Sequence, residues 1–519
     1  MTRVAYFVFI VILSLSVHEN EGARILAVFP FPSISHQVAF RPLIHELAKR
    51  GHDVTVITPD PAFPKGGTPA NLTEIDVHDI SYKTWKDFFK TTSGSQNDIK
   101  TQLAVLVELS AKIFGYQMET KEVQDIIKHK EFDLLFLEAI VRPALSLSHV
   151  FKVPVIQISS FFAVAGNYET IGAPVHPVLY PPLTRQRIYN LTFWEKVSDL
   201  YTHYDLLWQY NSQEDQENAM VKRIFGADTP NLSELSNNVD MLFLNVNPIW
   251  EGIRPVPPGV VYMGGVHQKP VKELPQELKS YLDSAVNGVI YISFGTNVNP
   301  SQLPPEKIQI LAKVFSELPY NVLWKWDKDV LPGQTENIKI SKWLPQSDLL
   351  RHPNIKLFIT QGGIQSTDEA ITAGVPLIGI PMLGDQWYNV EQYTYHKIGL
   401  RLDMETLTEE SFKNAVEEVI KDKSYRQNIK RLRILMDDQP QPPLERAVWW
   451  TEYVIRHNGA RHLRAPAANM GMYQYLEIDF VLSLLSIIAI IGSAVLGVLF
   501  YIVAKYLSRN YTVVKLKAS

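Results

Sequence analysis

Short runs of apolar, mostly β-branched residues alternate along the chain with longer segments in which apolar residues recur every three or four positions. Each short run predicts a buried strand, and each longer segment predicts an amphipathic helix. In the first half the strand runs are residues 25–29, 54–58, 134–137, 153–158 and 242–244. In the second half they are residues 289–293, 322–326, 338–340, 357–360 and 377–380. Strands that alternate with helices form parallel βαβ units, so the pattern predicts two α/β domains, each with a doubly wound sheet.

A proline-rich stretch separates the two sets of strands. Residues 247–259 contain four prolines, a composition that favours an interdomain linker. We therefore expect an N-terminal domain over residues 23–246 and a C-terminal domain over residues 260–479. The helical patterns over 411–436 and 444–457 can pack back over the two halves, so we expect helices of the C-terminal domain to return over the N-terminal half. Ligands of doubly wound sheets bind beyond the carboxyl ends of the strands, so two facing sheets would form a cleft.

Apolar segments at both ends direct the chain to a membrane. Arg3 is followed by an apolar run and then by small polar residues, a layout typical of a secretory signal over residues 1–22. The run is short for an uncleaved anchor, which needs about 20 apolar residues. Residues 480–504 carry no charge and predict a transmembrane helix. Acids precede this helix and only basic residues follow it, so we expect the tail over 505–519 in the cytosol and both domains in the lumen.

The tail also resembles a localisation signal. Lys515 and Lys517, five and three residues from the end, resemble the dilysine signal of endoplasmic-reticulum membrane proteins. A single-pass type I protein of that membrane is therefore expected. Glycosylation sequons on the lumenal side begin at Asn71, Asn190 and Asn231. The sequon at Asn510 lies beyond the membrane and is not expected to carry a glycan.

Composition and charge narrow the chemistry. The 519 residues are 46% hydrophobic and 20% charged, as in ordinary globular proteins. A net charge of −4 provides no broad basic surface, so we expect no nucleic-acid partner. The chain has no cysteine, which excludes disulfides, a thiolate nucleophile and cysteine zinc sites.

The most informative segment is residues 358–369, where a strand, a glycine turn and the start of a helix follow one another. Gly362 and Gly363 carry no side chain that would block a diphosphate, and a helix N-terminus offers free N–H groups and a positive dipole end. An ordinary strand-to-helix turn capped by Ser366 would show the same local pattern. The segment alone leaves both alternatives open.

Further motifs at fixed distances change this balance. Trp343-Leu344-Pro345-Gln346 precedes the turn, and Gly374-Val375-Pro376 and Gly384-Asp385-Gln386-Trp387 follow it. Together with the turn they resemble the signature of the UDP-glycosyltransferase family, most closely its animal membrane-bound, insect-like members. The similarity covers nearly the whole chain. It implies the GT-B fold, two facing Rossmann-like domains, and an inverting, metal-independent transfer of a hexose from a UDP-sugar to a hydroxyl of a small lipophilic acceptor, as in detoxification or conjugation.

The resemblance also implies donor-binding roles for particular residues. Trp343 would stack on uracil, and Gln346 would contact its edge. Ser366 and the glycine turn would hold the diphosphate, and Glu369 the ribose hydroxyls. Asp385 and Gln386 would hydrogen-bond the sugar hydroxyls. The remaining donor-site candidates are Ser293, Gly295 and Thr296, which resemble a first phosphate loop, with Gln365 and Gln361, the latter where vertebrate members commonly have His.

Two residues of the N-terminal half are candidates for catalysis. His36 follows the first strand, and imidazole suits a general base that deprotonates an acceptor hydroxyl. The resemblance matches His36 to the catalytic His of the family. Glu138 ends the strand run 132–137 where the family usually has Asp, and it would orient the base. The extra methylene leaves open whether its carboxylate reaches His36.

The sequence says less about the two substrates. The aromatic, proline-rich segments 85–89 and 159–182 predict either the wall of an apolar acceptor pocket or ordinary packing loops. We expect UDP-glucose as the donor, because insect members typically use glucose and residues 358–386 contain no cation to pair with a glucuronate carboxylate. Arg142 and Arg185 lie in loops that could supply such a cation, so UDP-glucuronic acid remains an alternative. The UDP-sugar is a co-substrate, and no separate cofactor or metal is expected.

Other functional classes fit less well. A non-catalytic lumenal binder of small lipophiles remains open, with Gln361 and Glu138 as its only sequence support. A dehydrogenase is disfavoured because no G-x-G-x-x-G motif occurs. The adjacent acids Asp368 and Glu369 point about 100° apart on a helix, which is a poor geometry for glycoside hydrolysis. The oligomeric state, homo- or hetero-oligomer, stays open.

Overall fold

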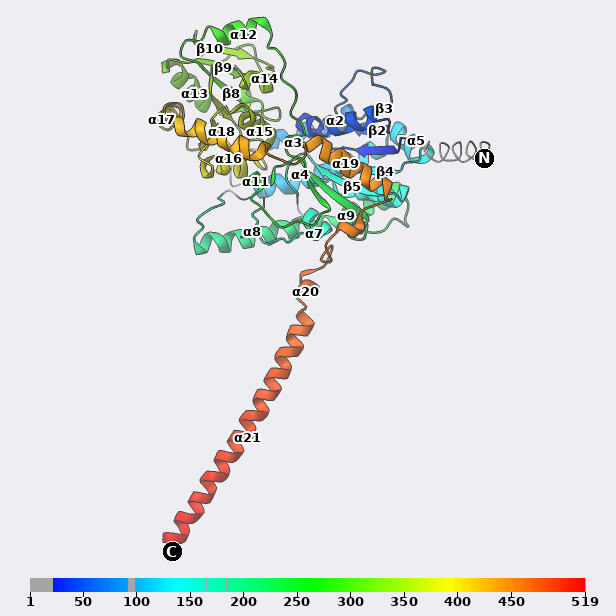
Figure 1. Cartoon of the computed structure of the whole chain (residues 1–519), viewed down its shortest axis with the longest axis vertical. Helices are drawn as coiled ribbons and strands as arrows, with labels where there is room; N and C mark the ends of the chain where they lie inside the picture. Colours follow the sequence, from blue (N-terminus) through cyan, green and yellow to red (C-terminus); the bar gives the residue numbers. More distant parts are fainter. Residues whose placement is uncertain (1–21, 92–98, 165, 183–184, 186, 519) are drawn as a thin grey trace, which may run out of the picture. The chain divides into compact units, whose positions relative to one another are not determined.

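The computed structural model describes residues 22–91, 99–164, 166–182, 185 and 187–518. These residues form two compact units, one ending at Pro466 and the other beginning at Ala467. The expected signal peptide lies, except for Gly22, outside the described residues. Figure 1 shows two separate groups of strands in the first unit.

The N-terminal group of strands is a parallel sheet in the order β3-β2-β1-β4-β5-β6-β7. Its strands are β1 (Arg24–Val28), β2 (Asp53–Thr58), β3 (Leu72–Asp76), β4 (Leu134–Glu138), β5 (Val155–Ser159), β6 (Val239–Leu244) and β7 (Val260–Tyr262). Strands β1, β4, β5 and β6 are buried almost throughout, which explains their continuous apolar runs. The pattern missed β3, an edge strand with only two apolar residues, Leu72 and Ile75, of which only Leu72 is buried.

The second sheet is also parallel, in the order β10-β9-β8-β11-β12-β13. Its strands are β8 (Val289–Ser293), β9 (Asn321–Lys325), β10 (Ile338–Ser341), β11 (Ile355–Thr360), β12 (Leu377–Gly379) and β13 (Gly399–Arg401). In both sheets the chain runs outward in one direction, returns to the first strand and continues in the other, which is the Rossmann order. The predicted fold class, two doubly wound α/β sheets, is confirmed.

Helices connect the strands. Those of the N-terminal half are α2 (Ile34–Lys49), α3 (His78–Thr91), α4 (Ile99–Met118), α5 (Lys121–His129), η2 (Arg142–Leu145), α6 (Ser146–Phe151), α7 (Asn167–Ile171), α8 (Phe193–Ser212), α9 (Glu214–Phe225), α10 (Leu232–Leu235) and η3 (Ser236–Asn238). Those that follow are α11 (Pro248–Glu251), α12 (Gln276–Asp283), η4 (Pro300–Gln302), α13 (Pro305–Glu317), α14 (Gln346–Leu350), α15 (Ile364–Ala373), α16 (Gln386–Tyr395), α17 (Glu409–Lys421), α18 (Lys423–Asp437), α19 (Pro443–Arg456) and η5 (Arg461–Leu463).

The predicted helical run 411–436 is two helices rather than one. Asp422 ends α17 and accepts a hydrogen bond from the Ser424 N–H at 2.8 Å, so its carboxylate caps the start of α18. After α18, the chain returns to the N-terminal half as α19, which packs against α2. Ala447, Val448 and Val454 of α19 are buried in the core of the first sheet.

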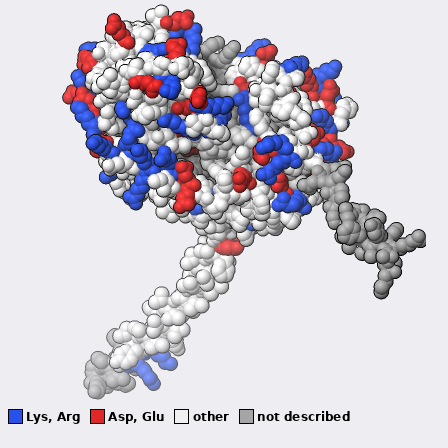
Figure 2. Space-filling model, turned by 45° about the horizontal axis from the view of Figure 1, so that its top comes forward, with Lys and Arg blue, Asp and Glu red and all other residues white. Residues whose placement is uncertain are grey.

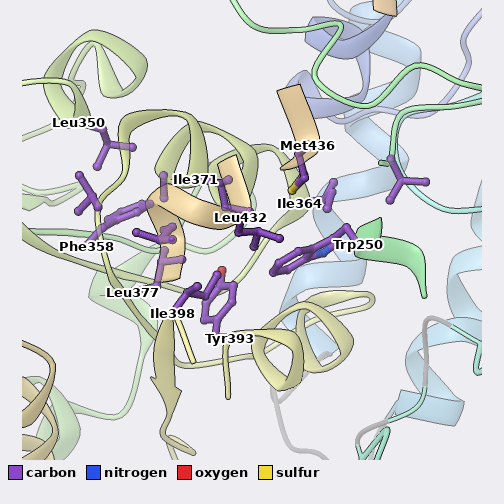
Figure 3. Close-up of a cluster of buried hydrophobic side chains, with 14 of the residues drawn as sticks. Trp250, Leu350, Phe358, Ile364, Ile371, Leu377, Tyr393, Ile398, Leu432 and Met436 are labelled. Carbon is purple, nitrogen blue, oxygen red and sulfur yellow. The ribbon is translucent and has the colours of Figure 1, made fainter. Parts of the chain in front are cut away.

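The predicted linker over 247–259 is not a loose connection. Trp250 of α11 is fully buried, and its indole N–H donates to Asn389 at 2.8 Å. Figure 3 shows Trp250 beside Tyr393 and Met436, within a core that consists mainly of residues of the second half. In addition, β7 pairs with β6, so residues 260–262 belong to the first sheet and not, as expected, to the C-terminal domain. The proline-rich stretch is therefore tightly packed where the chain passes from the first half to the second.

The second unit contains α20 (Met472–Tyr475) and the long helix α21 (Ile478–Ala518). Over Ile478–Asn510 this helix has a mean hydropathy of 2.7 in its most apolar window, and none of that window is buried. Figure 2 shows the middle of this helix without charged residues. The helix includes the predicted span 480–504 and is consistent with a membrane anchor.

Candidate active site

Both sheets direct their switch points toward one cavity of about 660 Å³. A switch point is the place where strand order reverses, and connections there leave in opposite directions and open a crevice. In the first sheet it lies between β1, which precedes His36, and β4, which carries Glu138. In the second it lies between β8 and β11, which precede the two predicted phosphate loops. The topology therefore brings the candidate residues of both halves to the same cavity.

His36 and Glu138 form a close pair at this cavity. His36 lies in the first turn of α2, and its Nδ1 is 2.6 Å from Oε1 of Glu138. A carboxylate only accepts, so the imidazole donates through Nδ1–H and leaves Nε2 as the nitrogen that can take a proton. The ring also stacks on Phe31, with centroids 4.4 Å apart. The geometry suits a general base held in one tautomer.

The extra methylene of Glu138 is accommodated. Its side chain is 1% exposed, and its second oxygen, Oε2, accepts a hydrogen bond from the Phe31 N–H at 3.1 Å. Two contacts thus fix both carboxylate oxygens beneath the ring. Glu138 does not line the cavity, whereas His36 does, so the carboxylate lies behind the imidazole.

On the donor side, glycines shape the backbone at two loops. Gly362 has φ +91°, and a Cβ there would collide with Val390. Gly295, in the loop after β8, has φ +76°, and a Cβ there would collide with the Gln361 amide. Both positions therefore require glycine. The helix α15 begins right after Gly363, so its free N–H groups and positive dipole end face the cavity.

Three predicted nucleotide contacts are bonded to one another. Nε2 of Gln346 donates to the Ser366 hydroxyl at 2.9 Å and to Glu369 at 2.7 Å. Tyr291 donates its hydroxyl to the Gln346 carbonyl oxygen at 3.0 Å, which fixes the amide orientation. Burial raises the pKa of Glu369 above its ordinary value. The residues assigned to uracil, phosphate and ribose thus form one preformed network beside Trp343, whose ring is 67% exposed.

Asp385 and Gln386 lie at the start of α16. Oε1 of Gln386 accepts hydrogen bonds from the Met382 and Leu383 N–H groups, both at 2.8 Å, so only its amide N–H₂ faces a ligand. Asp385 accepts a hydrogen bond from Asn389 at 2.7 Å. Burial raises the pKa of Asp385 to about 6, with the Asn389 hydrogen bond and nearby His36 opposing the shift. Asp385 therefore lies within electrostatic reach of His36.

Two contacts join the donor loops to the loop before His36. Nε2 of Gln365 donates to the Ser35 carbonyl oxygen at 2.5 Å, and Asn297 lies within hydrogen-bond distance of the Ser33 hydroxyl at 3.3 Å. Gln365 is thus engaged with the other half of the molecule. Gln361 is buried, and its Oε1 has no hydrogen-bond partner among the described residues.

Most of the predicted site residues line the cavity. Those that do are His36, Ser293, Gly295, Thr296, Trp343, Gln346, Gln361, Gly363, Gln365, Ser366, Glu369, Asp385 and Gln386. Glu138 and Gly362 lie behind this surface. Asp368 points elsewhere: it is buried away from the cavity, and burial raises its pKa to about 8. The structure brings the candidates together, while their individual roles stay predictions.

The acceptor side of the cavity is aromatic and aliphatic. Trp85, Phe161, Phe162 and Tyr180 line it, as the two predicted wall segments suggested. Sequence reasoning missed two further walls, α4 and α8, because a helix that lines a cavity shows the same periodicity as one that packs on a core. Their lining residues are Gln102, Leu103, Ala104, Leu106 and Val107 from α4, and His203, Leu206, Leu207, Gln209 and Tyr210 from α8.

The cationic side chains that line the cavity are not the two arginines that were expected there. Neither Arg142 nor Arg185 lines the cavity: Arg142 pairs with Glu217 at 2.6 Å, and Arg185 with Asp199 at 2.9 Å. Lys325, at the end of β9, lines it and was missed, as were Arg254, Lys269 and Lys272. The Lys325 ammonium donates to the Gly295 carbonyl oxygen at 2.7 Å, and burial lowers its pKa. Its place at the carboxyl end of a predicted strand was the available signal.

A metal site is a separate matter. Among the described residues, no group of three or more His, Asp or Glu side chains is arranged to hold a metal ion. Metal independence stays a prediction.

Comparisons with known proteins agree with this geometry. The model of the family described as UDP-glucoronosyl and UDP-glucosyl transferase matches residues 24–513. An ecdysteroid UDP-glucosyltransferase of Spodoptera littoralis nuclear polyhedrosis virus is 37% identical over 497 residues, which cover 92% of this chain and 96% of that protein. The human UDP-glucuronosyltransferase 2B7 is 29% identical over 472 residues, which cover 88% of this chain and 89% of that protein.

The fold has matching solved structures. A UDP-glucose: anthocyanidin 3-O-glucosyltransferase in complex with UDP superposes with a TM-score of 0.58 at 17% identity, covering 84% of this chain and 100% of that chain. This likeness concerns the fold. Because the family model spans both sheets, the loops at their switch points and most of α21, the chain belongs to the family of UDP-glucuronosyl and UDP-glucosyl transferases and is a UDP-glycosyltransferase.

Proposed function

We propose that this UDP-glycosyltransferase transfers glucose from UDP-glucose to a hydroxyl of a small lipophilic acceptor, with inversion and without a metal. The observation that carries the proposal is the 2.6 Å contact between His36 and Glu138, at a cavity with a polar nucleotide side and an apolar side. A base between two such surfaces can meet an acceptor hydroxyl and a donor sugar together.

The reaction would be a single displacement. Nε2 of His36 takes the proton of the acceptor hydroxyl as its oxygen bonds to the anomeric carbon, and the bond from that carbon to UDP breaks. Attack from the face opposite UDP inverts the anomeric centre. Glu138 stabilises the resulting imidazolium through Nδ1–H. The positive end of α15 and the N–H groups at its start stabilise the charge that develops on UDP.

The choice of sugar rests on charge and on relatives. Arg142 and Arg185, the two arginines considered as partners for a glucuronate carboxylate, pair with acids away from the cavity, and Arg254, which lines it, lies 3.8 Å from Glu251. Lys325 donates to the Gly295 carbonyl oxygen and lies 4.9 Å from the centre of the Trp343 ring, which supports a role for its charge near the nucleotide rather than the sugar. The viral relative at 37% identity is named a glucosyltransferase, and the human one at 29% a glucuronosyltransferase. These observations favour glucose.

The test compares donors. Microsomes that contain the full-length chain receive one phenolic acceptor and either UDP-glucose or UDP-glucuronic acid at equal concentration. We expect faster glycoside formation from UDP-glucose. Faster transfer from UDP-glucuronic acid would overturn the sugar assignment alone, and absence of UDP release with any donor or acceptor would favour the non-catalytic binder instead.

The proposed acceptor class rests on the chemistry of the cavity wall and on the name of one relative. The acceptor side of the cavity is lined by aromatic and aliphatic side chains, which suits a lipophile. Since the viral relative is named an ecdysteroid UDP-glucosyltransferase, a hydroxylated steroid belongs among the first acceptors to test. Such conjugation makes a lipophile more soluble, which is the chemistry of detoxification.

The proposed location is the endoplasmic-reticulum membrane, with the first unit in the lumen and the dilysine-like tail in the cytosol. Asn71 and Asn190 are exposed and are proposed to carry glycans. Asn231 is a poorer candidate, because its side-chain oxygen accepts a hydrogen bond from Lys222 at 2.8 Å. Endoglycosidase treatment of Asn71→Gln and Asn190→Gln variants tests orientation and sites together: loss of one glycan per variant is expected, and a chain without glycans would contradict the lumenal placement.

A further inference from the structure

Gln102 is a buried polar side chain on the apolar side of the cavity. It lies in the first turn of α4, lines the cavity and is 6% exposed. Neither Oε1 nor Nε2 of its amide has a hydrogen-bond partner among the residues that the structure describes. An unsatisfied buried amide costs about 1–3 kcal/mol, and proteins pair the great majority of such groups. An unpaired amide on a ligand cavity is therefore best explained as a ligand contact.

Neighbouring glutamines on the same wall differ from Gln102. Nε2 of Gln209 donates to Asp205 at 3.3 Å, and Nε2 of Gln213 donates to the Ala104 carbonyl oxygen at 3.3 Å. The Gln209 amide thus bonds within α8, and the Gln213 amide, just after α8, bonds to α4. Gln102 has no such structural task within the described residues, although the three side chains line one surface.

The helix α4 places Gln102 far from the end of that helix that contacts the loop before His36. At the other end of α4, Gln117 donates to the Pro30 carbonyl oxygen at 2.9 Å, directly before Phe31, which stacks on His36. Fifteen residues of helix separate Gln102 from Gln117, which is about 22 Å at the helical rise of 1.5 Å per residue. Between them, Leu106 and Val107 line the cavity with aliphatic side chains.

We propose that Gln102 is a polar subsite that hydrogen-bonds a carbonyl or hydroxyl at the end of the acceptor remote from the reacting hydroxyl. This inference rests on the proposed function and narrows its acceptor class to elongated lipophiles with a polar group at each end. An amide both donates and accepts, so either kind of group can pair with it. An acceptor without the remote group would leave Gln102 buried and unpaired, so the site discriminates against it.

The experiment uses two series of phenols with unbranched alkyl tails of increasing length, one plain and one with a ketone near the tail end. The ketone accepts a hydrogen bond and cannot itself be glycosylated. Transfer is measured with the full-length chain in microsomes and the UDP-sugar that it uses best. At one tail length we expect the ketone to raise kcat/KM about tenfold over the plain phenol, and at short lengths to have no effect.

Gln102→Leu should remove this preference, bringing the ratio within about twofold at every length, while kcat/KM for short phenols and KM for the UDP-sugar stay unchanged. Thr101→Val, at the exposed neighbouring position, is the matched control and should keep the preference. Because the amide has no partner among the described residues, Gln102→Leu should not lower Tm, which separates the subsite from a structural role.

The outcomes are distinguishable. Equal kcat/KM for both series at all lengths, or a ketone preference that survives Gln102→Leu, would overturn the subsite and leave the proposed function standing. A fall in Tm together with a uniform loss for all phenols would show that Gln102 is structural and would also overturn it. No transfer to any phenol would contradict the proposed function, and the inference with it.

Discussion

The donor and acceptor sides of the cavity are built differently. On the donor side, Gln346, Ser366 and Glu369 are already bonded to one another, and Gln386 is held by two backbone N–H groups. On the acceptor side the surface is mainly aromatic and aliphatic, and the Gln102 amide has no hydrogen-bond partner among the residues that the structure describes. A preformed polar network loses little entropy on binding and accepts one chemical pattern. An apolar wall selects by shape, so the enzyme should be strict toward its nucleotide and tolerant toward its acceptors.

The largest effect is expected where the two sides meet. His36→Ala removes the base, and general-base catalysis contributes about 10²- to 10⁴-fold. Turnover should fall by that factor while UDP affinity, measured by titration, stays within about twofold, because the nucleotide network lies in the second half. Near-normal turnover would exclude His36 as the base, and a large loss of UDP affinity would mean that the two sides are not independent.

Glu138→Gln tests the support behind the base. An amide cannot stabilise an imidazolium as a carboxylate does, so turnover should fall about 100-fold with KM for the donor unchanged. Glu138→Asp keeps the charge but shortens the reach across the 2.6 Å contact, so its turnover should lie between wild type and Gln. Equal, small effects of both variants would remove Glu138 from the mechanism.

Trp343→Ala probes the donor side alone. The exposed ring contributes little to the fold, and loss of stacking on uracil costs about 1–3 kcal/mol, or about 5- to 150-fold in UDP affinity. Trp343→Phe keeps a stacking surface and should recover most of that loss. Acceptor KM at saturating donor should be the same in all three proteins. A change in acceptor KM without a change in UDP affinity would place Trp343 on the wrong side of the comparison.

The same contrast explains what the sequence could predict. The predicted donor residues lie in short motifs at the ends of β8, β10, β11 and β12, where one turn fixes several side chains, and nearly all of them line the cavity. Both sheets were also predicted. The acceptor wall comes from α4, α8 and loops far apart in the chain, and a lining residue such as Leu106 cannot be told from a core residue by periodicity. The sequence also could not predict which side chains contact each other. Whether Glu138 contacts His36, or whether Arg142 faces the cleft or Glu217, depends on tertiary packing.

The smallest effect concerns the sugar itself, at Asp385. Burial raises the pKa of Asp385 to about 6, so its carboxylate is charged above that pH and becomes protonated below it. A charged carboxylate accepts hydrogen bonds from sugar hydroxyls more strongly than a neutral acid does. Affinity for UDP-glucose should therefore be constant above about pH 7 and fall as the pH drops through about 6. UDP lacks the glucosyl group, but its terminal phosphate itself titrates near about pH 6, so the comparison that isolates Asp385 is UDP-glucose binding to the wild type and to Asp385→Asn. Asp385→Asn keeps one acceptor oxygen without the charge, so it should weaken UDP-glucose binding about tenfold at pH 7.5 and abolish the step.

The measurement is calorimetric titration of both ligands between pH 5 and 8, without acceptor. A UDP-glucose step that persists in Asp385→Asn would assign the titration to a neighbour such as Glu369, whose pKa burial also raises.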